Sequence, residues 1–429
     1  MNSRFNLRRN VVTSIVAFVA NLALIFISYR AVIQVGGMAS LGLWSALMSW
    51  IFLIRLGDVG MATAAVRFIA RTDAAQNLAK VRAYLDTSIA LNLILFLVLV
   101  GISAPIFYYF LPRILPADAS TQATARVVLP VMFSGFVLSS LSGLILGGLI
   151  GLHRGYLASY VTVFGSVLQL IVVVALVPSY GLLGLAWGQI TQQAVMIVAG
   201  WTLVLRVLND EAGRHGGLLP RYFSRAALLE MLGFSLKAQF SNILNGLFEP
   251  LSKIIVGRTG GMEFLGLYEL AFKMVSLPRN AIVAGVHATT PAMARMLEDD
   301  MPAARQLYEA SKQKLMRRGA LVLVITVMAT PLASWLLMAR LDTALWELVV
   351  WLAVGFWGNM LGAPAYLVGV AKGKLGGNMI AATAALAVIG VTGLVSVWSD
   401  EAHLVIVGVS AGLALGGIVA LGLNQRFLK

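Results

Sequence analysis

Two short stretches decide the fold of this protein, because each is a near-copy of the other. Residues 36–44 read GGMASLGLW and residues 260–268 read GGMEFLGLY. Sliding the chain against itself by 224 residues extends this match without a gap, giving twelve identities over the 38 positions from Gln34 to Arg71. The sequence therefore predicts two homologous halves.

The chain around these stretches is too apolar to be soluble in water. Its mean hydropathy is +0.87, with 59% hydrophobic and 12% charged residues, which leaves too little polar surface to coat a 45.8 kDa globule. A membrane helix needs about 20 apolar residues, and a β-barrel strand would alternate instead. Twelve continuous runs predict an all-α integral membrane protein with twelve transmembrane helices: 11–33, 41–70, 83–111, 124–150, 157–178, 181–206, 228–256, 264–293, 319–340, 345–370, 377–398 and 402–424.

The basic residues predict the orientation of these helices. The net charge is +14, and of the 32 Lys and Arg residues, 22 lie on one side of the predicted membrane, four on the other and six within the runs. Cytoplasmic loops carry the excess of Lys and Arg, so both termini are expected in the cytoplasm. The basic charge is thereby explained by topology, and no nucleic-acid partner is expected. The first run is too long for a signal-peptide core and is expected to stay.

The repeat also predicts the domain organisation. Six spans per half is an even number, so both halves share one orientation, as in a parallel repeat. We expect an N-terminal six-helix lobe at 1–207, a cytoplasmic linker at 208–226 and a C-terminal six-helix lobe at 227–429. The linker is polar and contains glycine, as expected of a connection between two bundles.

Cofactor chemistry has no sequence signal here. The chain has no cysteine, which excludes disulfides and thiolate metal sites. The sequence has no HExxH motif, no Walker A motif and no paired-carboxylate pattern at a predicted membrane face. We expect no catalytic residue, no metal and no cofactor.

Two arginines lie where the lipid should be. Arg55 is about midway along its run, and the repeat places Arg279 at the equivalent position in the second half. A charge at mid-bilayer costs about 2.5–3.5 kcal/mol even on insertion scales, so such residues face a cavity or a partner. Gly57 and Gly60 interrupt the first helix and Pro278 the second, and interruptions at matching places in two halves indicate a transport site.

Polar stripes run along the seventh and eighth spans. Asn242, Asn245, Glu249 and Lys253 share one helical face, and so do Glu269, Lys273, Ser276, Asn280 and His287. Two such helices predict a water-filled, net-cationic groove. The alternative is that the charges pair off, because Glu249 with Lys253 and Glu269 with Lys273 are both spaced i, i+4 with the acid first.

A cationic site attracts anions, and Arg binds phosphate well through its fixed fork of donors. We expect Arg55, Arg279, Lys253 and Lys273 to hold a diphosphate, while four asparagines bond sugar or water: Asn21, Asn242, Asn245 and Asn280. An ion gradient of H⁺ or Na⁺ is the expected energy source unless product removal drives transport. Glu249, Glu269 and Asp58 are the candidate ion-coupling residues, because a carboxylate in a low-dielectric cavity can titrate near neutrality.

Several short glycine-rich motifs recur along the chain: Leu41 to Trp44, Leu56 to Gly60, Val66 to Phe68, Gly147 to Leu152, Gly181 to Ala186 and Phe264 to Tyr268. Together they resemble the polysaccharide flippases of the multidrug/oligosaccharidyl-lipid/polysaccharide exporter superfamily. The resemblance covers essentially the whole chain. It implies translocation of an undecaprenyl-diphosphate-linked oligosaccharide across the bacterial inner membrane for surface polysaccharide synthesis, by a transporter rather than an enzyme. Membrane lipids, a glycan polymerase and glycosyltransferases are the partners it implies.

Two alternatives remain open. One is a cation-coupled multidrug exporter of the same superfamily, because the acidic residues Asp58, Glu249 and Glu269 could bind the coupling cation. The surplus of deep positive charge favours an anionic substrate instead. A membrane-embedded glycan polymerase or ligase is the weaker alternative, because the predicted external loops are too short for an extended active site.

Overall fold

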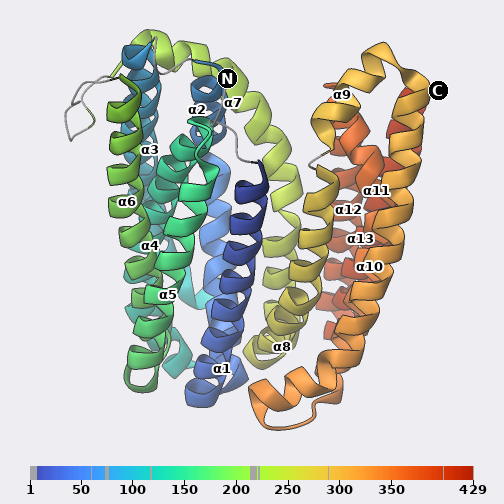
Figure 1. Cartoon of the computed structure of the whole chain (residues 1–429). Helices are drawn as coiled ribbons and strands as arrows, with labels where there is room; N and C mark the ends of the chain where they lie inside the picture. Colours follow the sequence, from blue (N-terminus) through green and yellow to red (C-terminus); the bar gives the residue numbers. More distant parts are fainter. Residues whose placement is uncertain are drawn as a thin grey trace. The chain divides into compact units, whose positions relative to one another are not determined.

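The structure is a computed structural model that describes residues 7–58, 60–72, 77–115, 118–212, 220, 223–287, 289–399 and 401–428. These residues form helices and short connections without any strand, which confirms the predicted all-α class. The helices, shown in Figure 1, are α1 (Leu7–Ile54), η1 (Arg55–Gly57), α2 (Met61–Arg71), α3 (Leu78–Ile114), α4 (Ala119–Gly151), α5 (Gly155–Tyr180), α6 (Leu182–Ala212), α7 (Arg225–Gly246), α8 (Phe248–His287), α9 (Thr290–Asp299), α10 (Met301–Met338), α11 (Thr343–Ala371), α12 (Gly376–Ser399), α13 (Ala402–Asn424) and η2 (Gln425–Leu428).

The described helices make this a multi-pass membrane protein. Nine of them are long and apolar enough to cross a bilayer. One span, Val16–Gly57, takes in most of the first predicted run, 11–33, and the first part of the second, 41–70. Helix α8 is not among the nine, because charged side chains recur along it at Glu249, Lys253, Glu269 and Lys273. The number twelve and the cytoplasmic position of the termini stay predictions.

Helices α1 and α8 are each interrupted at one glycine, and the two glycines are equivalent in the sequence repeat. Gly37 has φ 70° and ψ −177°, and Gly261 has φ 74° and ψ −177°. A positive φ with an extended ψ is open to glycine and strained for other residues. The repeated GGM motif therefore exists because each half needs the same backbone break.

A reciprocal close contact joins the segments that follow these two breaks. A Cβ added to Gly42 would lie 1.7 Å from the carbonyl oxygen of Met262, and one added to Gly266 would lie 2.2 Å from the carbonyl oxygen of Met38. Gly42 is equivalent to Gly266 in the repeat, and Met38 to Met262. The repeated glycines let the two backbones touch by equivalent surfaces.

The chain forms two compact units, and neither is continuous in sequence. The first unit is Met1–Gly36 with Ile51–Asn242, and the second is Gly37–Trp50 with Ile243–Lys429. The segment 37–50 thus belongs to the unit made mostly of C-terminal sequence. The predicted lobes at 1–207 and 227–429 stay predictions, and part of the predicted linker, at 213–219 and 221–222, lies outside the described residues.

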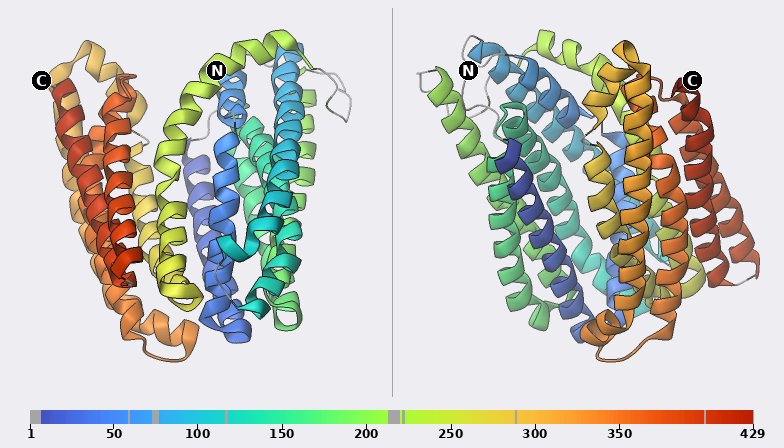
Figure 2. Two further views of the ribbon diagram at one scale, coloured as in Figure 1. Left: turned by 180° about the vertical axis from the view of Figure 1, so that it is seen from behind. Right: turned by 45° about the vertical axis from the view of Figure 1, so that its right-hand side comes forward.

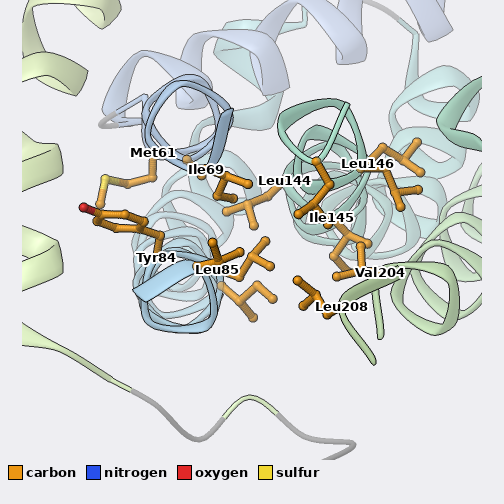
Figure 3. Packing of buried hydrophobic residues seen from close by; sticks show 14 of the residues in the cluster. Met61, Ile69, Tyr84, Leu85, Leu144, Ile145, Leu146, Val204 and Leu208 are labelled. Carbon is orange, nitrogen blue, oxygen red and sulfur yellow. The ribbon is translucent and has the colours of Figure 1, made fainter. Parts of the chain in front are cut away.

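The core of the first unit lies among α2, α3, α4 and α6. Met61 and Ile69 from α2 pack with Tyr84 and Leu85 from α3 and with Leu144 from α4 (Figure 3). The start of α7 joins the same cluster through its own apolar side chains, Ala227 and Met231. Hydrogen bonds between α3 and the start of α7 strengthen this attachment. The first turn of α7 is therefore part of the first unit by packing as well as by chain order.

In the second unit, α11, α12 and α13 form a tightly packed group. Figure 2 shows α12 and α13 side by side in both of its views. Glycine permits the close approach of α11 to α13, since a Cβ at Gly362 would lie 2.2 Å from the carbonyl oxygen of Gly417. Small residues at helix contacts are typical of membrane interfaces, where backbones approach closely. This packing fixes the position of Asn359, one turn before Gly362.

Candidate functional site

Four charged residues of α8 form one connected cluster in the second unit. The Glu249 Oε1 atom lies 2.5 Å from Lys253 Nζ and 2.7 Å from Lys273 Nζ. Lys253 Nζ also lies 2.6 Å from Glu269 Oε2. The cluster therefore runs Lys273–Glu249–Lys253–Glu269, with two cations and two carboxylates and no net charge.

The fold-back of α8 explains which residues pair. Lys253 stands eight residues before Gly261 and Glu269 eight after it, while Glu249 and Lys273 stand twelve before and twelve after. When a helix turns back at a central residue, positions equally far from the turn come to lie opposite each other. The contacts follow this rule, and the i, i+4 pair of Glu249 with Lys253, predicted as the alternative to ligand binding, is present as well.

Burial divides the cluster into an inner and an outer pair. The side chains of Lys253 and Glu269 are 6% and 3% exposed, whereas those of Lys273 and Glu249 are 22% and 39% exposed. The inner pair is held further by Ser45, whose Oγ donates a hydrogen bond of 2.6 Å to Glu269 Oε2. Only the outer pair remains accessible to a ligand.

Ser45 was missed by the sequence analysis, although the repeat carries the signal. Ser45 is the repeat equivalent of Glu269, 224 residues earlier. Because Gly42 and Gly266 already touch reciprocally, residues three positions further on meet in the same way. The first half thus supplies a neutral hydroxyl where the second half supplies a carboxylate, so the two halves differ in charge at their contact.

Arg279 lies on α8 and has amide partners in place of a carboxylate. Its Nη1 donates to Asn280 Oδ1 at 2.9 Å, and its Nη2 donates to Asn359 Oδ1 at 2.5 Å. The guanidinium carbon lies 5.7 Å from the ring centroid of Phe356, a cation–π distance. Its buried Nε has no hydrogen-bond partner, and no ion pair of Arg279 occurs within the part of the chain that is described.

Asn359 fixes the orientation of this arginine and was also missed. Its Nδ2 donates to the carbonyl oxygen of Leu413 on α13 at 3.2 Å. That bond leaves Oδ1 to face Arg279. Because Asn359 is 80 residues away from Arg279 on another helix, no linear pattern in the sequence connects them.

Arg55 occupies a different environment from its repeat equivalent. It begins the 3₁₀ helix η1 in the first unit, and its side chain is exposed. Throughout the ranges that the structure covers, the Arg55 side chain has no hydrogen bond or ion pair. Asp58 follows η1, and its Oδ1 accepts a hydrogen bond of 2.9 Å from the Gly60 backbone N–H, which shapes the turn into α2.

The remaining predicted residues are asparagines that the cluster does not include. Asn21 is exposed on α1, and Asn280 is exposed beside Arg279. Asn242 and Asn245 lie on α7, and their side chains are outside the described part of the structure. Among the residues that are described, no group of three or more His, Asp or Glu side chains could hold a metal ion.

Comparison with known proteins gives the family. Residues 93–350 match the family model described as polysaccharide biosynthesis protein. The chain belongs to this family. No curated protein matches the sequence.

Solved structures resemble this chain along nearly its whole length. An inward-facing multidrug resistance MATE family transporter of the MOP superfamily has a TM-score of 0.80 at 16% identity, covering 95% of this chain and 94% of that chain. The lipid II flippase MurJ in an inward closed conformation has a TM-score of 0.71 at 12% identity, covering 96% and 86%. The predicted resemblance to the superfamily is confirmed, and the fold of this family member is that of MATE transporters and MurJ.

A third solved structure shares the fold. It is a MOP superfamily transporter from Pyrococcus furiosus, with a TM-score of 0.67 at 17% identity, covering 96% of this chain and 95% of that chain. It is described as having a binding pocket of reverse polarity that suggests a different function.

Proposed function

We propose that this protein is a flippase that moves an undecaprenyl-diphosphate-linked oligosaccharide across the bacterial inner membrane for surface polysaccharide synthesis. It would span the membrane twelve times with both termini in the cytoplasm, and it would work by alternating access without an enzymatic step. Its family membership supports the pathway. The fold supports the comparison with MurJ, which is described as a lipid II flippase.

One observation carries the proposal, and it is the uncompensated charge of Arg279. The Arg279 side chain is half-buried and its Nε is fully enclosed, and an ion taken out of water without an opposite charge is costly. Two asparagine oxygens and one aromatic face offset only part of this cost. An anionic substrate would complete the arrangement, and a diphosphate suits it because guanidinium binds phosphate through two parallel hydrogen bonds.

The four-residue cluster adds a second cation that a ligand can reach. Lys273 has Glu249 as its partner, and both side chains are partly exposed. A phosphate that reached Lys273 would compete with Glu249. Lys253 is enclosed by two carboxylates, so its proposed role is to hold Glu249 and Glu269 in place.

The remaining predicted residues take supporting roles in this proposal. Arg55 would bind phosphate in the first unit, where its side chain is exposed and free of ion pairs across the described ranges. The asparagines Asn21, Asn242, Asn245 and Asn280 would bond sugar or water. The coupling ion would be H⁺ or Na⁺, carried by Glu249, Glu269 or Asp58, and Glu249 is the most exposed carboxylate of the cluster. A glycan polymerase and glycosyltransferases would be the pathway partners.

A cation-coupled multidrug exporter is the second candidate, favoured by the similarity to MATE structures. The sign of the charge at Arg279 separates the two. Transport of a cationic drug is opposed by a half-buried cation that has no carboxylate beside it, whereas transport of a diphosphate is favoured. A polymerase or ligase finds no support in the arrangement of these side chains.

The test uses the purified full-length protein in liposomes with a fluorescent polyprenyl-diphosphate-linked glycan. We expect translocation by the wild type, loss in Arg279→Ala, and partial retention in Arg279→Lys, because lysine keeps the charge without the fork of donors. Arg258→Ala, at an exposed arginine on the same helix, is the matched control and should transport normally. Exchange of a cationic dye for protons or sodium, without glycan movement, would instead support drug export.

A further inference from the structure

Helix α10 carries three basic residues that the proposed function does not use. Lys314, Arg317 and Arg318 are all exposed. No hydrogen bond or ion pair of these side chains occurs anywhere in the described ranges. The spacing of three and four residues puts the three on one side of the helix.

The same side of α10 continues as an apolar stripe. At about 100° per residue, the three basic residues and seven exposed apolar residues fall within one arc of about 120°. The apolar residues are 45–75% exposed: Leu321, Val324, Ile325, Met328, Leu332, Trp335 and Leu336. The opposite side of the helix is buried at Leu315, Leu323, Thr330 and Leu337, so the arc is the face that α10 turns away from the protein.

The length of the stripe matches one bilayer core. From Arg318 to Trp335 the helix rises about 26 Å at 1.5 Å per residue, close to the roughly 30 Å of hydrocarbon in a membrane. Trp335 then stands where interfacial tryptophans are enriched. The basic residues consequently lie at the level of the head groups at the other end of the stripe.

The two ends of α10 differ in net charge. Beyond the Trp335 end, Arg340 is neutralised by Asp342, with Nη2 2.9 Å from Oδ2. At the basic end, Glu309 lies about a sixth of a turn outside the arc and makes no ion pair with the three cations within the described part. Of the two ends of α10, the basic end is therefore the one where cations without an ion pair in the described ranges lie next to the apolar stripe.

We propose that Lys314, Arg317 and Arg318 form a binding site for the phosphate of an anionic phospholipid whose acyl chains lie along the apolar stripe of α10. A free phosphate or a nucleic acid would use the charges but leave the stripe unexplained, whereas a phospholipid uses both. The arginine pair supplies forked donors to the phosphate oxygens. The site is separate from the glycan-binding residues, so it does not depend on the proposed function.

The experiment is native mass spectrometry of the full chain in detergent with equimolar phosphatidylglycerol and phosphatidylcholine. Wild type should retain phosphatidylglycerol preferentially, and the preference should weaken as salt is raised. A basic residue near a membrane surface contributes a factor of about five in affinity. The triple variant Lys314→Gln/Arg317→Gln/Arg318→Gln should therefore bind phosphatidylglycerol up to about a hundredfold more weakly, with phosphatidylcholine adducts unchanged.

Two control variants isolate the position of the charge. Lys314→Arg/Arg317→Lys/Arg318→Lys keeps the charge and should keep the preference. The variant Arg30→Gln/Arg126→Gln/Arg258→Gln removes three exposed arginines elsewhere and should keep it too. The proposal is overturned if the wild type does not prefer phosphatidylglycerol, or if the neutral triple variant binds phosphatidylglycerol as well as the wild type. It is also overturned if the Arg30→Gln/Arg126→Gln/Arg258→Gln control loses as much of the preference as the neutral triple variant. The preference of the wild type for phosphatidylglycerol can be measured even if a variant fails to fold. The lipid-binding experiment and the glycan transport experiment are independent, so failure of one proposal does not decide the other.

Discussion

Replacement of Lys253 by methionine tests whether the α8 cluster holds the protein together. The lysine joins two carboxylates, and its loss leaves the nearly buried Glu269 without the cation 2.6 Å away. Breaking a buried ion pair by removing one partner costs about 3–5 kcal/mol, because an uncompensated charge remains. Glu249 also loses its contact with Lys253 but keeps Lys273 at 2.7 Å, so most of the loss comes from Glu269.

The double variant Lys253→Met/Glu269→Gln makes this prediction sharper. Both buried charges are then gone, and the glutamine oxygen can still accept the hydrogen bond that Ser45 donates to Glu269. Replacing a buried pair by neutral groups is often tolerated. We therefore expect the double variant to be more stable than Lys253→Met alone.

The assay is equilibrium unfolding in mixed detergent and dodecyl sulfate micelles, followed by circular dichroism. Lys372→Met, at an exposed lysine, is the control and should change the free energy of unfolding by less than about 0.5 kcal/mol. A cost below about 1 kcal/mol for Lys253→Met, or a double variant no more stable than the single one, would refute the reasoning.

Three further predictions follow from the packing and the caps. Gly266→Ala should prevent folding or lower the unfolding midpoint sharply, since the new Cβ would lie 2.2 Å from a facing carbonyl oxygen, whereas Gly285→Ala, with nothing within 4 Å, should be neutral or stabilising in the same assay. Asn359→Asp should give Arg279 the carboxylate it lacks, which offsets the lost hydrogen bond to the Leu413 carbonyl oxygen. The protein should therefore still fold while glycan transport in liposomes falls at least tenfold, and unchanged transport would contradict the anion site. Hydrogen bonds from Ser120 and Thr121 hold the pKa of the Asp118 carboxyl well below its usual range, so its N-cap on α4 stabilises above the unfolded-state pKa of about 4 and this stability is lost as pH falls through the lower folded pKa. Unfolding of Asp118→Ala should accordingly become less different from wild type under strongly acidic conditions, and a pH-independent difference would contradict this.

Much of the fold could be predicted from composition and from the repeat. The apolar runs predict membrane helices because the backbone must be hydrogen-bonded internally in lipid, and continuous runs suit a helix whereas barrel strands alternate. The repeated GGM motif correctly predicts equivalent structure, since Gly37 and Gly261 have nearly the same backbone angles. The count of spans is harder to read, because the charges that give α8 its chemistry also lower its hydropathy.

The candidate site could be predicted only in part. The i, i+4 spacing reveals the Glu249–Lys253 contact, because helical neighbours follow from sequence alone. The Lys253–Glu269 contact requires knowing that α8 turns back at Gly261, which is a statement about tertiary structure. Asn359 could not be found at all, because its link to Arg279 depends on how α11 packs against α8.

The placement of segment 37–50 in the second unit has a consequence for biogenesis. Gly42 leaves the ribosome about 220 residues before its contact Met262, a delay on the order of 10–40 s at ordinary rates of synthesis. During that time, a transmembrane segment of the newborn chain lacks its permanent neighbour. Truncated chains that end before α8 should hence be held by insertion factors or degraded, and two separately expressed halves should assemble only when produced together.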